Sequence, residues 1–585
     1  MLSNIKNPHD LRAIQSINQL NELSTEIRGF LINTLSEIDH AHFSANLGVV
    51  ELTLALHYSF ETPEDLLFWD IGHQGYVHKM LTGRLSEIVK IRTKTSVSGF
   101  LSRSESVYDV FGAGHAGTSI SAALGASIAN KIRHSKVHHV AIIGDASLGS
   151  GMAFEALNHL SDLKNINLTV VINDNNCSID ASVGGMSKHL QHLANSSIDQ
   201  TIFENLGLAY AGPYDGHDLE SLIDVFSACK KTGGIHVIHC ITKKGKGYFP
   251  AENGMDAHWH APGKFDANTG ANLSPAKTTR YQDVFAATLI ALATDNPKIV
   301  AITAGMLSGT SLGQFQKHFP DRCFDVGIAE QHAVTLAAGL STQGVVPFCA
   351  IYSTFMQRGF DQVIHDVALQ NLPVVFCVDR AGLVGHDGAT HQGVFDIAFF
   401  RIIPNLFIAS PSNAKDLKNL LYSSQEKLSG PLVIRYPRGK VDAEVTYDSY
   451  SFIEIGKGRC LQKGKDLLVF CLGTVLNEAL LAIKALEKNS VSIGLYDMIF
   501  VKPLDEALLH EALAIGAPVV TIEEGTLIGG FGSSIAEFIL THGYKNKLVR
   551  LGLPDEFISH GSQNEQREEY GLDAKGIAKQ LSNLL

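Results

Sequence analysis

Short apolar runs rich in valine and isoleucine alternate with longer amphipathic stretches along most of the chain. Residues 140–143, 168–172 and 237–241 have the length and composition of buried strands. Between the first two, residues 152–160 place apolar side chains at helical spacing. Largely apolar strands that alternate with helices are typical of parallel sheets covered on both faces. The pattern therefore predicts an α/β fold with mostly parallel sheets.

The alternation is interrupted twice, and the interruptions divide the chain into three predicted domains. Residues 253–279 are polar and contain glycine and proline, which indicates a linker. A second α/β set begins with a predicted helix at 281–293 and a strand at 299–302. A third set begins with the apolar run at 467–470, after a weakly patterned stretch. The expected domains are residues 1–270, 280–445 and 455–585.

Composition and charge restrict the function more than the fold. The 585 residues are 45% hydrophobic and 18% charged, as in a protein with large buried cores. Net charge −12 disfavours non-specific nucleic-acid binding, which depends on lysine and arginine. No apolar run reaches the ~18 residues of a membrane helix, and eight scattered cysteines without a CxxC pair suggest reduced thiols. We expect a cytoplasmic enzyme with no nucleic-acid or membrane partner.

Two consecutive predicted strands end in oxygen-bearing side chains. The first runs into Gly-Asp-Ala-Ser-Leu-Gly at residues 144–149, and the second ends in Asn-Asp-Asn-Asn at residues 173–176. Ligands bind at the carboxyl ends of strands in open α/β sheets. Asp145 and Asn175 offer the hard oxygens that suit Mg²⁺, and small neighbours let backbone N–H groups approach phosphate. Each turn alone is common, but the pair predicts a magnesium–diphosphate site.

This pair of segments resembles the motif of thiamine-diphosphate enzymes, which begins Gly-Asp-Gly and ends Asn-Asn. Ala146 stands at the third position here and keeps its backbone N–H, although it tolerates fewer turn conformations than glycine. The resemblance implies thiamine diphosphate and Mg²⁺ as cofactors. It also implies that Asp145 and Asn175 ligate the metal together with the backbone carbonyl of Cys177.

A second motif carries the other half of the expected cofactor site. Residues 324–333 read Phe-Asp-Val-Gly-Ile-Ala-Glu-Gln-His-Ala and resemble the pyrimidine-domain motif of transketolase-like enzymes. The resemblance implies that Glu330 is the buried carboxyl group that activates the cofactor through its aminopyrimidine ring. Phe355 is the expected aromatic partner of that ring. A glutamate favoured by the helix dipole and a plain core phenylalanine are the alternatives.

Further motifs extend the likeness in order along nearly the whole chain. They include Trp-Asp-Ile-Gly-His-Gln-Gly-Tyr at 69–76, Gly-His-Ala-Gly-Thr-Ser at 114–119, Asp-Gly-Ala-Thr-His-Gln-Gly at 387–393 and Arg-Tyr-Pro-Arg-Gly at 435–439. The chain resembles the 1-deoxy-D-xylulose-5-phosphate synthase family of transferases. That family joins pyruvate, with loss of carbon dioxide, to D-glyceraldehyde 3-phosphate, and its product feeds isoprenoid, thiamine and pyridoxal synthesis. The resemblance implies a three-domain transketolase-like fold and a homodimer.

The same resemblance assigns most of the site residues. Cofactor contacts are expected from His73, Gly114, His115, Ala116, Ala146, Ser147, Lys244, Tyr248 and His260. Binding the phosphate of a phosphorylated aldehyde needs positively charged groups with paired N–H donors, and the guanidinium groups of Arg380 and Arg438 supply them. Imidazoles take both proton states near neutrality, which suits proton transfer or substrate orientation. His42 and His391 are expected in that role, joined by Asp387 and Arg358, with Tyr352 as a hydroxyl partner of the phosphate.

The chain departs from the family pattern in two places that matter for function. It lacks much of a long insertion after the Asn-Asn motif, and Ala116-Gly117 replaces the family's Ser-Ser. Two alternatives stay open: a paralogue such as a transketolase or acyloin-forming enzyme with another donor or acceptor, and a catalytically silent paralogue. The pair Arg380 and Arg438 favours a phosphorylated acceptor. The joint presence of the expected metal, glutamate and histidine residues disfavours a silent protein.

Overall fold

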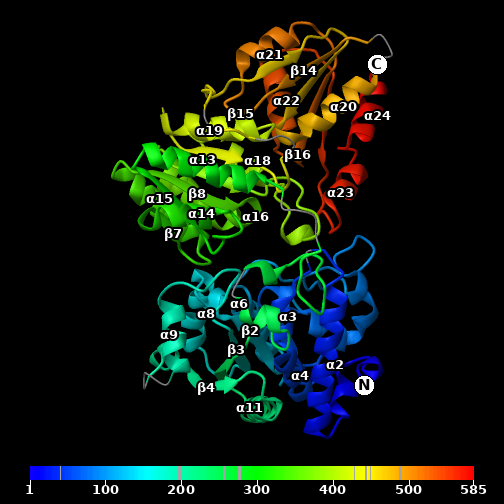
Figure 1. Ribbon diagram of the computed structural model, residues 1–585, viewed down its shortest axis with the longest axis vertical. Helices are drawn as coiled ribbons and strands as arrows, with labels where there is room; N and C mark the ends of the chain where they lie inside the picture. The colour runs from blue at the N-terminus through cyan, green and yellow to red at the C-terminus, as the bar shows by residue number, and fades with distance from the viewer. Residues whose placement is uncertain are drawn as a thin grey trace. The chain divides into compact units, whose positions relative to one another are not determined.

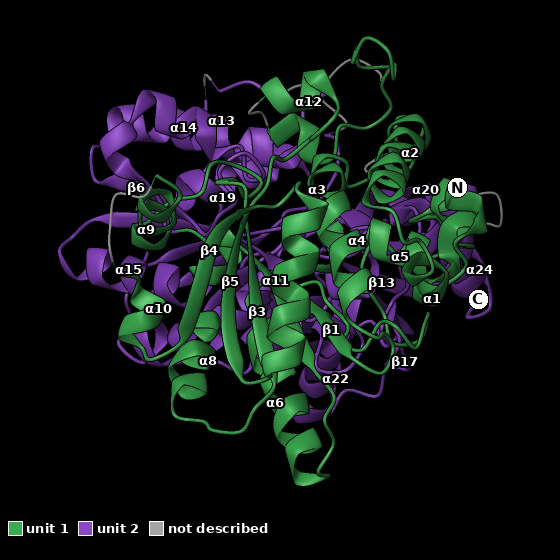
Figure 2. Ribbon diagram, turned by 90° about the horizontal axis from the view of Figure 1, so that it is seen from below, with its two compact units in different colours: residues 1–276, 327–329 green, residues 277–326, 330–585 purple. Residues whose placement is uncertain are grey.

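The computed structural model describes all residues except 40, 196–199, 255–256, 274–277, 427, 442–444, 448 and 487–490. The chain forms two compact units, shown in green and purple in Figure 2. Unit 1 comprises Met1–Ala276 and Gly327–Ala329, and unit 2 comprises Lys277–Val326 and Glu330–Leu585. The helices and strands follow one another along the chain as labelled in Figure 1.

Unit 1 is built on one parallel sheet with the strand order β1-β2-β3-β5-β4. Its strands are β1 (Leu66–Trp69), β2 (His139–Gly144), β3 (Leu168–Asp174), β4 (Ala209–Asp215) and β5 (Ile235–Ile241). Because side chains alternate along a strand, Val140 and Ile142 join the core on one face, while Ala141 and Ile143 join the core on the other. The predicted strands at 140–143, 168–172 and 237–241 are confirmed.

The helices of unit 1 cover both faces of this sheet, and Figure 2 shows α4 and α11 on one of them. They are α1 (Pro8–Arg12), α2 (Ile17–Leu35), α3 (Ser44–Gly48), α4 (Val50–Ser59), α5 (Tyr76–Lys79), α6 (Ser119–Ile132), α7 (Asp145–Leu148), α8 (Gly151–Ser161), α9 (Gly185–Ala194), α10 (Ile202–Asn205), α11 (Leu219–Thr232) and α12 (Phe249–Asn253). The helix predicted at 152–160 corresponds to α8.

Unit 2 contains two sheets. The first has the order β15-β10-β11-β9-β8-β6-β7, and the second has the order β12-β14-β13-β16-β17. The strands are β6 (Ile299–Thr303), β7 (Cys323–Asp325), β8 (Val346–Tyr352), β9 (Val375–Asp379), β10 (Phe407–Ala409), β11 (Leu432–Arg435), β12 (Arg459–Gln462), β13 (Leu467–Leu472), β14 (Ile493–Asp497), β15 (Phe500–Lys502), β16 (Val519–Thr526) and β17 (Leu548–Leu553). Only the pairs β10–β15 and β12–β14 are antiparallel among these described strands.

The helices of unit 2 pack around these two sheets. They are α13 (Tyr281–Asp295), α14 (Leu312–His318), α15 (Glu330–Thr342), α16 (Ser353–Met356), α17 (Phe360–Gln362), α18 (Asp396–Arg401), α19 (Ala414–Glu426), α20 (Leu476–Leu486), α21 (Glu506–Leu513), α22 (Phe531–Thr541), α23 (Gln563–Glu569) and α24 (Ala574–Ser582). None of the helices described is long and apolar enough to cross a membrane. The predicted class, α/β with mostly parallel sheets, is confirmed.

Strand β15 explains why the last two predicted domains share one unit. It follows β14 in sequence but pairs antiparallel with β10, so a segment of the third predicted domain completes the sheet of the second. The side-chain amine of Lys502 extends this junction by donating to the carbonyl oxygens of Arg401, at 3.1 Å, and Ile403. The domain bounds expected from the sequence stay a prediction.

The predicted linker at residues 253–279 contributes to the core of unit 1, so its interpretation as a connecting segment is only partly correct. Phe265 is fully buried, and its ring centroid lies 5.0 Å from that of Phe43. Trp259 is also buried, with its ring centroid 5.2 Å from that of Phe265. Polar neighbours concealed these two aromatic anchors in the sequence pattern.

Candidate cofactor and substrate site

The predicted metal ligands lie at one edge of the unit 1 sheet. Strands β2 and β3 are parallel neighbours, with Gly144 opposite Asn173. Asp145 follows β2 directly as the first residue of α7, and Asn175 follows β3. The carbonyl oxygen of the Asn175 side chain accepts a hydrogen bond from the backbone N–H of Cys177 at 3.1 Å. The three residues expected to bind magnesium are therefore on two adjacent strand ends.

Asp145 has the electrostatic character of a cation ligand. Its side chain is nearly buried, and its carboxylate accepts a hydrogen bond from the Ser182 hydroxyl at 2.6 Å. Burial raises the pKa of Asp145 to about 7, with the charge of Asp174 adding to the effect. A buried carboxylate is costly unless a cation offsets its charge, and hard oxygens suit Mg²⁺. The donor set fits that ion.

The described residues contain no second kind of metal site, one built from several His, Cys, Asp or Glu side chains. Among them, no group of three or more His, Cys, Asp and Glu side chains is arranged to hold a metal ion. A magnesium set made of one carboxylate, one amide and one backbone carbonyl does not need such a group, because Mg²⁺ completes its shell with water and phosphate oxygens.

Lys244 lies beside this set. Its amine donates to the carbonyl oxygen of Ser178 and lies 3.3 Å from the Cys177 sulfur. Burial lowers the pKa of His73 to about 4, and the positive charge of Lys244 contributes to that shift. His73 is therefore a neutral imidazole near pH 7, next to a cation that suits a diphosphate.

Asp70 holds the loop that carries three more predicted cofactor contacts. One carboxylate oxygen accepts from the backbone N–H of Gly117 at 2.9 Å, and the other accepts from that of Ser119 at 3.0 Å. Gly117 has a φ of +80°, and a Cβ there would meet the Ser150 hydroxyl oxygen at 2.1 Å. A serine at position 117 would be strained by this backbone conformation and would require the Ser150 side chain to move, which favours the glycine found here. The other residues of this set are placed as follows: Gly114, His115 and Ala116 precede α6, and Ala146 and Ser147 lie in α7.

Three predicted histidines come together in unit 1. The ring centroids of His42, His73 and His260 lie 5.3–5.4 Å apart in all three pairs. The buried side chain of Asn46 connects two of their segments by donating to the carbonyl oxygens of His42, at 2.9 Å, and His73, at 2.8 Å. Its own carbonyl oxygen accepts from the backbone N–H of Tyr76 at 2.9 Å. Asn46 is a positioning residue that the sequence motifs contained but did not reveal.

Tyr248 occupies a packed position. Its ring meets those of Phe43 and Trp259 edge to face, with centroids 5.4 and 5.5 Å away. Its hydroxyl donates to the Asp266 carbonyl oxygen at 3.4 Å. Core packing accounts for this side chain, and its expected contact with the cofactor stays a prediction.

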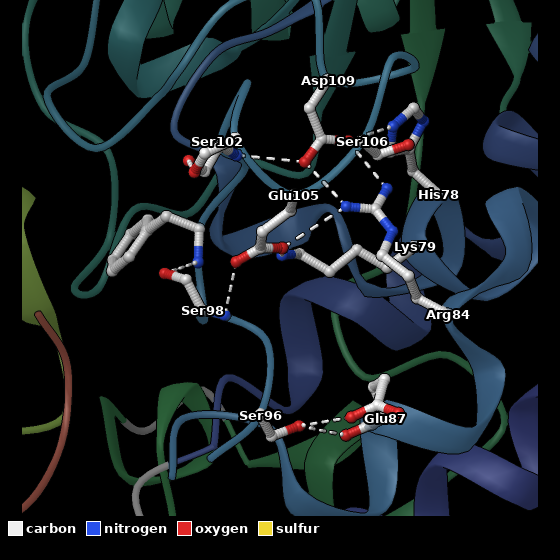
Figure 3. Close-up of polar contacts among 12 residues, drawn as sticks. His78, Lys79, Arg84, Glu87, Ser96, Ser98, Ser102, Glu105, Ser106 and Asp109 are labelled. Carbon is white, nitrogen blue, oxygen red and sulfur yellow. Dashed lines mark hydrogen bonds and ion pairs between the residues drawn. The ribbon is translucent and has the colours of Figure 1, made fainter. Parts of the chain in front are cut away.

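An ionic cluster supports the segment that leads into the cofactor loop (Figure 3). We define the ionic cluster as His78, Lys79, Arg84, Glu105 and Asp109. The Asp109 carboxylate accepts from both terminal nitrogens of Arg84, at 2.7 and 2.8 Å, and lies 3.0 Å from His78 Nε2. Glu105 pairs with Lys79, whose side chain is fully buried. The cluster ties residues 98–109 to the end of α5.

In unit 2, Glu330 is the first residue of α15 and its side chain is buried, only 4% exposed. Its Oε2 atom accepts no hydrogen bond from any residue that the structure describes. The Arg358 guanidinium lies 4.0 Å from that oxygen. Burial raises the pKa of Glu330, and the charge of Arg358 opposes this rise. A buried carboxyl oxygen that has a distant cation but no hydrogen-bond partner among the described residues can accommodate a ligand with a ring nitrogen.

Four predicted residues form a row of flat groups near the ends of β8 and β9. The Arg380 guanidinium lies 3.8 Å from the centre of the Tyr352 ring. That ring stacks on Phe355 at 5.6 Å, and Phe355 meets His391 edge to face at 5.5 Å. The Thr390 hydroxyl lies 2.7 Å from Nδ1 of His391 and restrains its ring. The row joins a cation to an imidazole through two aromatic rings.

Asp379, immediately before Arg380, is a buried group that the sequence did not single out. Neither of its carboxyl oxygens has a hydrogen-bond partner among the described residues. Burial raises its pKa to about 7, and the charge of Arg380 opposes this shift. Arg380 has a φ of 58°, a left-handed conformation that is strained for a bulky residue. Strain and an unsatisfied carboxyl group next to each other are typical of functional sites.

Helix α23 contacts the backbone of Arg438, the second predicted phosphate ligand. Arg438 donates to the Asp387 carboxylate at 2.9 Å and to the Val384 carbonyl at 3.1 Å. The side-chain amide of Gln563, at the start of α23, donates to the carbonyl oxygens of Leu383, at 2.6 Å, and Arg438, at 3.1 Å. The start of α23 therefore supports the backbone at Leu383 and Arg438. No local motif around Gln563 could have shown this.

Comparison with known families places these observations in a class. Residues 277–443 match the model of the transketolase pyrimidine-binding domain, and residues 456–577 match that of the transketolase C-terminal domain. With the oxygen ligands at one sheet edge and the buried Glu330, they define a transketolase-like, thiamine-diphosphate-dependent enzyme. Residues 2–200 and 194–242 match the N-terminal model of 1-deoxy-D-xylulose-5-phosphate synthase.

Relatives over the whole chain make the assignment specific. The 1-deoxy-D-xylulose-5-phosphate synthase of Cytophaga hutchinsonii is 44% identical over 100% of this chain and 98% of its own length. That of Parabacteroides distasonis is 45% identical over 99% and 98%. That of Listeria monocytogenes is 44% identical over 100% and 97%. The chain belongs to the 1-deoxy-D-xylulose-5-phosphate synthase family.

The comparisons also locate the shortened segment. The two pieces of the N-terminal match meet at residues 194–200, shortly after the Asn-Asn motif. The alignment with the Cytophaga relative spans 628 positions, whereas the chain has 585 residues. The alignment with the Listeria relative spans only 594 positions, so that relative is nearly as short. A shortened chain thus occurs elsewhere in the family.

We expect Asp109→Ala to lower the free energy of unfolding by about 3–5 kcal/mol, because the buried Arg84 loses both short hydrogen bonds to Asp109 and keeps a longer ionic contact, 3.4 Å, with Glu105. Urea unfolding at pH 7 measures this, with the exposed Asp224→Ala in α11 as a matched control that changes it by less than about 0.5 kcal/mol. Equal losses in the two variants would contradict the role of the cluster.

The same variant should show a defined pH dependence. Burial alone would raise the pKa of Asp109, but hydrogen bonds from Arg84 and His78 outweigh it and hold the pKa well below its usual range. The stabilisation by Asp109 is therefore fully present above the pKa of an aspartate in the unfolded chain, about 3.9, and it is lost as the pH falls from there toward the lower pKa of the folded state. The difference between the wild type and Asp109→Ala should shrink below about pH 4.

Proposed function

We propose that this chain condenses pyruvate, with loss of carbon dioxide, and D-glyceraldehyde 3-phosphate to 1-deoxy-D-xylulose 5-phosphate. This reaction is the first step of the non-mevalonate isoprenoid pathway, and its product also supplies thiamine and pyridoxal synthesis. Membership of the family supports the reaction. The single observation that carries the acceptor assignment is the row that joins Arg380, Tyr352, Phe355 and His391.

Thiamine diphosphate and Mg²⁺ are the cofactors in this proposal. Asp145, Asn175 and the Cys177 carbonyl would ligate the metal, and Lys244 would neutralise diphosphate charge. Glu330 would hydrogen-bond the aminopyrimidine through its buried oxygen, which accepts no hydrogen bond from the described residues. When bound, thiamine diphosphate supplies the nucleophilic carbon for decarboxylation and bond formation, and the protein holds and ionises it.

The remaining site residues bind the acceptor and move protons. Arg380 and Arg438 would bind its phosphate, because guanidinium groups match phosphate oxygens in pairs. The Tyr352 hydroxyl would add a donor to the same phosphate. His42 and His391 would hold or deliver protons at the reacting oxygens, since imidazole takes both proton states near neutral pH. Asp387 would orient Arg438 through their ion pair, and Arg358 would orient Glu330 in the same way.

Several finer expectations belong to the same proposal. Residues 1–270 would be the diphosphate-binding domain, residues 280–445 the pyrimidine-binding domain and residues 455–585 the C-terminal domain. A homodimer is proposed from family membership. The cytoplasmic location stays a prediction. The family assignment does not favour the alternative of a paralogue with another donor or acceptor.

A product assay tests the proposed reaction. Purified protein is incubated with thiamine diphosphate, Mg²⁺, pyruvate and D-glyceraldehyde 3-phosphate, and each component is omitted in turn. We expect 1-deoxy-D-xylulose 5-phosphate only in the complete mixture. Carbon dioxide release without this product would point to another acceptor, and the absence of any turnover would indicate a silent paralogue.

Arg438→Ala should raise the KM for D-glyceraldehyde 3-phosphate by at least about tenfold, because it removes a charge-assisted contact to phosphate. The KM for pyruvate should change by less than about twofold. Steady-state kinetics with each substrate varied separately measures the two values. Equal increases in both would remove Arg438 from the phosphate site.

Gln563→Ala should act in the same direction but more weakly, because Gln563 holds Arg438 only through its backbone. We expect about a threefold rise in the KM for D-glyceraldehyde 3-phosphate, in keeping with the loss of one neutral hydrogen bond. Gln314→Ala, an exposed change on α14, is the matched control and should leave both KM values unchanged. An unchanged acceptor KM in Gln563→Ala would mean that α23 does not support Arg438.

A further inference from the structure

Phe100 lies against a histidine to which the proposed function gives a chemical role. The Phe100 ring meets the His42 ring edge to face, with centroids 5.3 Å apart and an interplanar angle of 67°. Both side chains are nearly buried, with 3% of Phe100 and 7% of His42 exposed. The Tyr76 hydroxyl lies 3.3 Å from Nδ1 of the same imidazole. Phe100 therefore limits how the His42 ring can turn.

The short segment that carries Phe100 is held on both sides by the ionic cluster, through the contacts of Ser98 and Ser102 that are drawn in Figure 3. The backbone N–H of Ser98 donates to Glu105 at 2.7 Å, and that of Ser102 donates to Asp109 at 3.0 Å. Each anchor is two residues from Phe100. Hydrogen bonds from backbone groups to carboxylates are among the stronger ones in proteins, and here Asp109 is buried and Glu105 partly buried, so the segment is well anchored.

The segment is also packed against the loop that carries His73. A Cβ on Gly72 would meet the backbone nitrogen of Leu101 at 2.8 Å, and a Cβ on Gly75 would meet a Leu101 side-chain carbon at 2.8 Å. The two glycines therefore permit this close approach. Leu101 follows Phe100 directly, so the two chain segments fix each other beside the histidines.

Two imidazoles connect the ionic cluster to α4, the second helix after the His42 segment. His57, on α4, places its Nε2 atom 3.0 Å from Nδ1 of His78. His78 in turn lies 3.0 Å from Asp109. His57 also lies 2.9 Å from the Thr62 hydroxyl, and both imidazoles are fully buried. The same cluster therefore contacts both the Phe100 segment and α4.

We propose that Phe100 is a positioning residue that fixes the orientation of the His42 imidazole, with the ionic cluster as its support. Phe100 acts through His42 and not on substrate, so this inference rests on the proposed function of His42. A small misplacement of a reacting group is enough to lower a rate considerably. The apolar ring edge supplies the restraint, and the two anchored backbone groups keep that edge in place.

A double-mutant cycle tests the proposal, with Phe100→Leu and His42→Ala alone and combined in the full-length enzyme loaded with thiamine diphosphate and Mg²⁺. Leucine keeps much of the apolar bulk but removes the ring edge. We expect Phe100→Leu to lower kcat by about fivefold in the wild-type background and by less than about 1.5-fold in the His42→Ala background. Cofactor affinity and Tm, measured in parallel, should stay near wild-type values.

Phe111→Leu is the matched control, because Phe111 lies in the same part of the chain and its ring contacts Phe68. It should leave kcat unchanged. An equal fivefold loss from Phe100→Leu in both backgrounds would overturn the proposal, since the effect would not pass through His42. A wild-type kcat in His42→Ala alone would instead overturn the role of His42 in the proposed function.

A second measurement does not depend on turnover. The rate at which diethyl pyrocarbonate modifies His42 in the protein without cofactor can be followed by peptide mass spectrometry. A less restrained imidazole reacts faster, so Phe100→Leu should raise the His42 rate by about threefold or more and leave that of the exposed His365 unchanged. An unchanged His42 rate would show that Phe100 does not restrain the ring.

Discussion

The constraint on which the structure depends is the cost of burying a carboxyl group. Asp70 and Asp109 meet that cost with hydrogen bonds from backbone N–H groups or arginine, and both hold loops in fixed positions. Glu330 and Asp379 keep buried oxygens that no described residue satisfies, and Asp145 has a pKa raised to about 7. Unsatisfied buried oxygens are uncommon, so Glu330 and Asp379 differ in this respect from Asp70 and Asp109. Asp70 and Asp109 have their hydrogen bonds within the protein. Glu330 and Asp379 keep oxygens that can accept a hydrogen bond from a ligand.

The groups that support the site come from distant parts of the chain. In unit 1, the ionic cluster fixes the segments beside His42 and His73. In unit 2, β15 completes the sheet that carries Tyr352, and Gln563 holds the backbone of Arg438. Two C-terminal segments, β15 and α23, thus support the region that contains Tyr352 and Arg438. Changes in the last quarter of the chain should therefore alter acceptor binding without touching the chemistry.

Much of the fold could be predicted from the sequence, because buried parallel strands are recognisable as apolar runs between helices. The positions of Asp145 and Asn175 at one sheet edge could be predicted because each follows such a run, and their role as metal ligands stays a prediction. The linker was misjudged because polar neighbours concealed Trp259 and Phe265, and burial depends on tertiary contacts. Residues such as Gln563 act through partners more than a hundred positions away, which no local pattern records.

Family resemblance supplied what the pattern alone could not, above all the role of Glu330. An isolated glutamate at a helix start is usually explained by the helix dipole. Glu330 differs from that ordinary case because it is buried and one of its oxygens accepts no hydrogen bond from the described residues. Resemblance and geometry therefore support the same residue independently. Asp379 shows the reverse situation, because its burial is evident in the structure while its sequence motif drew attention only to the neighbouring arginine.

The most direct test of this account is the turnover of Glu330→Gln at saturating thiamine diphosphate and Mg²⁺, with cofactor binding measured separately by calorimetry. Glutamine keeps the shape of the side chain but cannot exchange the proton. The account predicts that binding stays within about tenfold of wild type while turnover falls by about a thousandfold or more, as expected for loss of a positioned acid–base group. Turnover equal to wild type would contradict it, because the buried carboxyl group would then have no part in activating the cofactor.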